Sequence, residues 1–222
     1  MVCPVEECRV AHAHAISALS VRDRVLRAGP PGGCRCPARP ATYAWPVQVD
    51  ELETPELVDA LRVGEVQLGF VRPPIADGLR VETVWVEEFV AAVPDTSRLC
   101  ALPAVSAADL SEHPVVLFPR TSGTGYWDRV ARFFQQAGIE FAPIESAEHV
   151  TTILGQVALG IGVSVVPASA ERVAIPGVTY VPLDRPAPLP LAVASNPGMT
   201  PLAARRVLEH LPSARIRRQH SQ

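Results

Sequence analysis

The chain has 222 residues, of which 48% are hydrophobic, so it is long enough to bury one large core or two smaller ones. Its formal net charge of -3 excludes the extended basic surface that nucleic-acid binding by this chain alone would need. No apolar run reaches the roughly 18 residues of a membrane-spanning helix, and the first residues lack the basic and apolar regions of a signal peptide. We therefore expect a cytoplasmic protein without a membrane partner.

Residues 1–46 differ in pattern from the rest of the chain. The stretch AGPPGGCRCPARP (28–40) is rich in turn and breaker residues and has no sustained periodicity, which predicts a disordered segment. Four cysteines and two histidines lie in this part of the chain: Cys3, Cys8, Cys34, Cys36, His12 and His14. The spacings C-x4-C and C-x-C differ from the C-x2-C pairs of most structural zinc modules, so we expect free thiols, with neither a metal nor another cofactor.

Regular patterns begin at Val47. VQVDEL (47–52) alternates like a strand, and a helix follows in which Thr54 is the expected N-cap and Gly64 the residue that ends it. VQLGFV (66–71) predicts the next strand, which completes a β-α-β unit. Residues 79–93 predict one or two further strands.

A second block with the same order begins with the buried strand VVLFP (115–119) and the Gly-rich turn RTSGTG (120–125). Helices are predicted over 126–137, where Gly138 stops the helix, and over 146–159. The strand VSVVP (163–167) comes next. A short helical stretch (168–173), strands over 178–183 and 189–194, and a helix over 200–211 complete a pattern of α/β type.

Few residues suggest chemistry by themselves. The RTSGTG turn could direct backbone N–H groups at an anion from a helix N-terminus, although an ordinary turn fits the pattern as well. Arg72 and Glu87 could pair beneath a cleft or form a surface ion pair. His113 and His149 have no companion at ligand spacing, and no Ser/His/Asp, Cys/His or paired-carboxylate arrangement is legible. The sequence therefore predicts a protein that is not an enzyme.

Four phrases in order resemble the effector-binding domain of LysR-type transcriptional regulators. They are ELVDALRVGEVQLGFVR (56–72), EEFVAAVP (87–94), VVLFPRTSGTGYWDRVARFFQQAGI (115–139) and VTTILGQVALGIGVSVVPAS (150–169). The last phrase is the most specific, because a helix, a Gly-x-Gly turn and a buried strand ending in Val-Pro recur in this family. The resemblance extends from Val47 to Leu211.

The resemblance implies an α/β fold of the type 2 periplasmic-binding-protein class, with two Rossmann-like lobes and a cleft between them. Lobe I would comprise 47–93 plus 191–222, and lobe II would comprise 98–187, with crossing strands near 93–97 and 188–192. The effector would be a small molecule, and two helix N-termini at one cleft favour a carboxylate such as an aromatic acid. The residues implied to contact it are Thr54, Arg72, Thr121, Ser122, Gly125 and Tyr126.

The chain also departs from the family pattern. A winged helix-turn-helix and a linker helix are not legible in residues 1–45, and the family's first effector-contacting Ser or Thr would fall at 22–28, which reads RDRVLRA. We therefore expect an incomplete lobe I, and DNA binding only through a helix-turn-helix absent from this chain. The resemblance further implies a homo-oligomer formed through the effector domain. A transport solute-binding protein of the same fold and a truncated, non-functional regulator fragment remain as alternatives.

Overall fold

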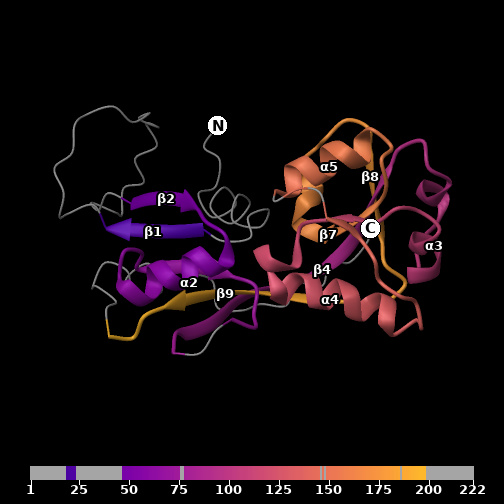
Figure 1. Ribbon diagram of the computed structural model, residues 1–222. Coiled ribbons are helices and arrows are strands. Elements are labelled where there is room, and N and C mark those ends of the chain that lie inside the picture. The colour runs from indigo at the N-terminus through magenta and orange to yellow at the C-terminus, as the bar shows by residue number, and fades with distance from the viewer. Residues whose placement is uncertain are drawn as a thin grey trace.

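The structure, a computed structural model, describes residues 19–23, 47–75, 78–145, 147, 149–185 and 187–198. These residues form two α/β lobes placed side by side, as Figure 1 shows. The predicted helix over 200–211 and the cysteines of the N-terminal segment lie outside the described residues. Within the described residues, no helix is long and apolar enough to cross a membrane.

Lobe I is built on an antiparallel sheet with the strand order β2-β1-β3-β9-β4. Strand β1 (Leu19–Asp23) lies within the segment predicted to be disordered, and no sequence pattern indicated it. It pairs antiparallel with β2 (Val47–Glu51) and with β3 (Leu68–Val71). The expected β-α-β unit therefore has another strand between its two strands.

Helix α2 (Thr54–Val63) connects β2 to β3 and buries Leu57, Val58 and Leu61. The prediction that Thr54 is the N-cap is wrong: Thr54 is the first helical residue, and Glu53 has the extended N-cap conformation, with φ -66° and ψ 154°. Pro55 tolerates this shift because the first turn of a helix needs no N–H donor from it. Gly64 ends the helix as predicted, in a left-handed conformation with φ 77°.

Lobe II surrounds the second half of β4 (Arg80–Pro94), which pairs antiparallel with β7 (Ser164–Pro167) and β8 (Val178–Pro182). The short parallel pair β5 (Val116–Leu117) and β6 (Ile144–Glu145) extends this lobe. Its helices and 3-10 turns are η2 (Arg98–Ala101), α3 (Ala107–Ser111), η3 (Arg120–Ser122), α4 (Thr124–Gln135), α5 (Val150–Ala158) and η4 (Ala168–Arg172). Helix α4 begins two residues before its predicted start, and α5 begins four residues after it.

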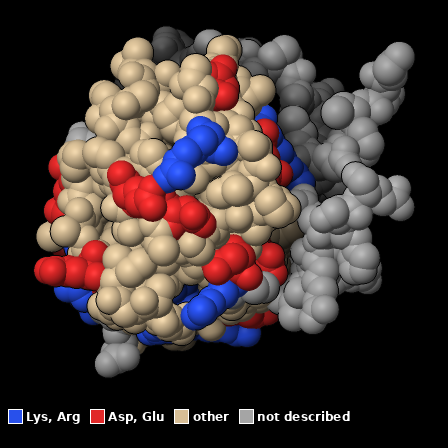
Figure 2. Space-filling model, turned by 90° about the vertical axis from the view of Figure 1, so that its right-hand side faces the viewer, with Lys and Arg blue, Asp and Glu red and all other residues tan. Residues whose placement is uncertain are grey.

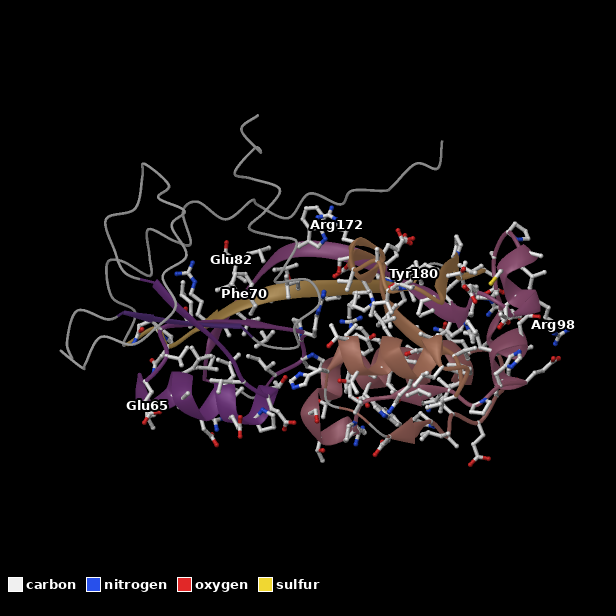
Figure 3. The ribbon with its side chains drawn as sticks, turned by 90° about the horizontal axis from the view of Figure 1, so that it is seen from above. Glu65, Phe70, Glu82, Arg98, Arg172 and Tyr180 are labelled. Carbon is white, nitrogen blue, oxygen red and sulfur yellow. The ribbon has the colours of Figure 1, made fainter. Side chains whose placement is uncertain are left out.

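Two long strands connect the lobes. Strand β4 pairs with β9 (Pro188–Ser195) from Arg80 to Glu88 and then with β7 and β8 from Phe89 onward. Figure 3 shows β9 extending from the lobe that holds Tyr180 into the lobe that holds Phe70. The lobe limits proposed from the sequence remain a prediction, but the change of partner along β4 marks where this strand passes between the lobes.

Each lobe has buried apolar clusters of its own. In lobe I, α2 packs on one face of the sheet against Val71 and Ala192, and the other face buries Phe70 and Val84. In lobe II, one cluster lies beneath α4 and includes Phe89 and Leu189, and a smaller one lies beneath α5. The crossing strands contribute to clusters in both lobes, so the two cores share the same two strands.

Candidate functional site at the lobe junction

Lobe I contributes Arg72 to the junction, directly after β3. Its side chain is 6% exposed, and Nη2 lies 2.5 Å from Oε1 of Glu87 on β4. Nη1 donates to the carbonyl oxygen of Leu189 on β9 at 3.3 Å. Of the two pairings left open by the sequence, the buried pair is correct and the surface ion pair is not.

Glu87 links this pair to lobe II. Its second oxygen, Oε2, accepts a hydrogen bond of 2.9 Å from the backbone N–H of Ser169 in η4. The carboxylate is therefore held by a guanidinium and a backbone donor at a site with little water, where charge-assisted hydrogen bonds are strong. Because Glu87 balances the charge of Arg72, the arginine contributes less free positive potential than the sequence suggests. Ser169 is a junction residue that no sequence signal distinguished.

Lobe II contributes the turn η3 and the first turn of α4. Within this segment Ser122, Gly125 and Tyr126 are buried, whereas Thr121 is exposed. A Cβ atom at Gly125 would lie 2.1 Å from the carbonyl oxygen of Arg72 and 2.6 Å from that of Pro73. Only glycine allows this approach, so the N-terminus of α4 lies directly against the end of β3.

Tyr126 is a core residue of this turn. Its hydroxyl donates to the carbonyl oxygen of Val165 at 2.7 Å, and its ring packs edge-on against Phe89 and Phe118, with centroid distances of 5.0 and 4.7 Å. Burial raises the pKa of the Tyr126 phenol, and the nearby charge of Arg72 opposes that rise. The hydroxyl is thus already used within lobe II.

A hydrogen bond between side chains joins the two lobes at the helix N-termini. Ser122 Oγ donates to Oε1 of Glu53 at 3.2 Å, across the junction from η3 to the start of α2. Glu53 therefore does not cap its own helix. Thr54, the next residue, is half-buried beside it. No sequence signal indicated Glu53, because a glutamate before a helix is common and carries no local trace of a contact made 69 residues away.

The surface of lobe II does not form a basic patch on the face seen in Figure 2, where basic and acidic side chains are scattered and adjacent. Arg98, labelled in Figure 3 at the outer end of this lobe, pairs with Glu112. Arg120 pairs with Asp128 at 2.8 Å. These pairs neutralise arginines that would otherwise attract phosphates.

The fold and the junction define a two-lobed α/β domain suited to hold a small ligand between its lobes. The family model of the LysR substrate binding domain matches residues 44–215, so the chain belongs to this family of ligand-sensing domains of transcriptional regulators. The family assignment confirms the resemblance found in the sequence.

Known relatives agree with this assignment. The HTH-type transcriptional regulator TtuA of Agrobacterium vitis is 33% identical over 140 residues, which are 61% of this chain and 45% of that protein. A variant of the BenM effector binding domain has a TM-score of 0.64 at 28% identity, covering 72% of this chain and 76% of that one. The BenM effector binding domain with its effector benzoate has a TM-score of 0.60 at 26% identity, covering 72% and 78%. BenM is an HTH-type regulator of Acinetobacter baylyi.

These comparisons confirm the predicted fold class, two lobes with a cleft in the type 2 periplasmic-binding-protein manner. The chain spans about half the length of the curated relatives it matches. The effector contacts assigned to Thr54, Arg72, Thr121, Ser122, Gly125 and Tyr126 remain a prediction.

Proposed function

We propose that this domain binds a small carboxylic acid between its lobes and so controls how a longer, homo-oligomeric regulator acts on DNA in the cytoplasm. The observation that carries the proposal is the bond from Ser122 to Glu53, because a hydroxyl beside the start of α4 already donates to a carboxylate there. Helices α2 and α4 both begin at this junction, and the N-terminus of a helix favours negative charge. Benzoate, the effector named for BenM, belongs to the same chemical class.

A ligand carboxylate would compete with Glu53 for Ser122. On binding, it would take the hydrogen bond from Ser122 Oγ and displace the glutamate side chain into solvent, which its half-buried position permits. Thr54 and Thr121 flank this point from the two lobes and could add hydroxyl contacts. The ligand would then bridge the lobes in place of the internal contact.

Calorimetric titration with benzoate and a panel of aromatic and dicarboxylic acids tests the proposal. Ser122→Ala should weaken binding by about ten- to a hundredfold, because a hydrogen bond to a charged group contributes about 1.5–3 kcal/mol. Glu53→Gln should strengthen binding, since it keeps an acceptor for Ser122 but removes the competing charge. Ser111→Ala, at an exposed serine of α3, is the matched control.

The proposal fails if no acid of the panel binds the wild-type chain. It also fails if Ser122→Ala and Ser111→Ala bind with the wild-type affinity. A gain of affinity in Glu53→Gln for a neutral amide as large as the gain for its parent acid would show that charge is not what the junction recognises.

A further inference from the structure

Arg129 lies on α4, one helical turn after Gly125, and reaches the strand that crosses between the lobes. Its Nη1 donates to the carbonyl oxygen of Pro188, the first residue of β9, through a long contact of 3.5 Å. Its Nε atom is buried and has no hydrogen-bond partner among the described residues. Buried donors are nearly always satisfied, so this atom requires an explanation.

The charge of Arg129 is also uncompensated. Five other arginines of the described chain have a carboxylate within 4.0 Å, but Arg129 has none there: the paired ones are Arg62, Arg72, Arg80, Arg98 and Arg120. Burial lowers the pKa of the Arg129 guanidinium, and the positive charges of Arg132 and Arg72 lower it further. A partly buried cation without a carboxylate partner is costly unless an anion joins it.

A second edge of the Arg129 guanidinium has the geometry that an oxyanion needs. Since Nη1 is used by Pro188, the edge formed by Nε and Nη2 would make two parallel hydrogen bonds to an anion that reaches the buried Nε atom. The same edge of Arg120 holds the Asp128 carboxylate in this chain, with distances of 2.8 and 3.2 Å. A carboxylate bound to Arg129 would have the same two-bond geometry as the pair of Arg120 with Asp128.

We propose that Arg129 is the anion-binding residue of a site between α4 and the beginning of β9, and that this site takes one oxyanion group, either the carboxylate of an effector or a free inorganic anion. The first case rests on the proposed function, and the second does not. Gly125, four residues earlier in α4, touches the backbone of Arg72 in lobe I. An anion held by Arg129 would therefore tie α4 to a crossing strand next to the lobe junction.

The test measures thermal unfolding and calorimetric binding at constant ionic strength, with sodium benzoate in one arm and sodium sulfate in the other. The wild-type chain is compared with Arg129→Gln, with Arg129→Lys and with Arg80→Gln, a control at an arginine whose side chain is 68% exposed. At least one anion should raise the melting temperature of the wild type and of Arg80→Gln. Arg129→Gln should lose that rise and bind at least tenfold more weakly, whereas Arg129→Lys should keep part of it.

Folding of the variant is checked in anion-free buffer, where Arg129→Gln should melt at the wild-type temperature or above it, because a partly buried charge without a carboxylate partner has been removed. The proposal is overturned if Arg129→Gln keeps the full anion-dependent rise, or if neither anion stabilises the wild type. Benzoate binding that Ser122→Ala loses and Arg129→Gln keeps, with no sulfate effect that depends on Arg129, would sustain the proposed function and overturn this one. A sulfate effect that Arg129→Gln abolishes, without binding of any acid, would sustain the anion site and overturn the proposed function.

Discussion

Arg72 is held by the fold before any ligand arrives. Its guanidinium is paired with Glu87, donates to Leu189 and is connected through Glu87 to Ser169, so four segments of both lobes meet at one ion pair. The ion pair therefore joins segments of both lobes without a ligand. Mutation of Arg72 therefore combines an effect on stability with an effect on binding, and the two must be measured separately.

We expect Arg72→Ala to lower the free energy of unfolding by about 3–5 kcal/mol, because it leaves the Glu87 carboxylate buried without its partner. The double change Arg72→Met with Glu87→Leu should recover most of that loss, since an apolar pair of similar volume removes the unpaired charge. Urea unfolding of the three proteins is the measurement. A loss below about 1 kcal/mol in Arg72→Ala, the level of an exposed ion pair, would contradict the buried description.

Tyr126 gives a prediction in the alkaline range. Burial raises the pKa of its phenol in the folded state, so the full stabilisation is present below the unfolded-state pKa of about 10 and declines as the pH rises above it. Tyr126→Phe should cost about 1 kcal/mol at neutral pH through the lost bond to Val165, but its stability should fall less between pH 9 and about 11. Tyr180→Phe, at a tyrosine less buried than Tyr126, is the control. Equal alkaline slopes in wild type and Tyr126→Phe would contradict the argument.

At the scale of elements, the N-terminus of α4 is positioned by the absence of a side chain. We expect Gly125→Ala to lower the free energy of unfolding by about 1–3 kcal/mol, because the added methyl group would overlap the backbone carbonyls of Arg72 and Pro73. Gly155→Ala in α5 is the matched control, since nothing lies within 4 Å of the position that its methyl group would take. That change should be neutral or stabilising, as alanine favours a helix by about 1 kcal/mol over glycine.

Calorimetric or chemical unfolding of both variants tests the contrast between the two glycines. Similar effects of the two substitutions would mean that the contact between α4 and the end of β3 is not maintained in solution. A loss of acid binding in Gly125→Ala without a loss of stability would instead place the alanine methyl group in the path of the ligand.

The sequence predicted most elements because their signals are local. The apolar stripe of α2 with Gly64 after it, and the buried runs of β3 and β7, need no knowledge of distant residues. The single 15-residue strand β4 was predicted as one or two strands, because its change of partners from β9 to β7 and β8 depends on the sheet and not on its own residues.

The candidate site could be predicted only in part, for the same reason. Arg72 follows one apolar run and Glu87 begins another, so both could be recognised in the sequence. Whether they form a buried pair or a surface pair depends on how the lobes pack around them. Glu53 and Arg129 acquire their roles from residues far away in the sequence, Ser122 and Pro188. Local patterns carry no information on such contacts.

At the scale of the whole molecule, the crossing strands determine how the lobes can move. Strand β9 begins in the core of lobe II, where Leu189 is fully buried, and ends in lobe I, where Ala192 and Ala194 are fully buried. The contacts of Ser122 with Glu53 and of Gly125 with the Arg72 backbone also join the two lobes. A ligand that replaces the first contact can therefore change the relation of the lobes without disturbing either core.

The charge distribution of the whole chain leads to the last prediction, that the chain alone shows no sequence-specific affinity for DNA. Its net charge is -3, and five arginines of the described chain are paired with carboxylates. Specific binding depends on several phosphate contacts in addition to base contacts, and most of the affinity for phosphates comes from free cationic side chains. A gel-shift titration at about 0.15 M salt, with the promoter region beside its gene and an unrelated fragment of equal length, is the measurement. The two fragments should bind equally weakly, and binding should vanish as salt increases. A saturable shift of the promoter fragment alone would contradict the prediction and would require a basic surface beyond the described residues.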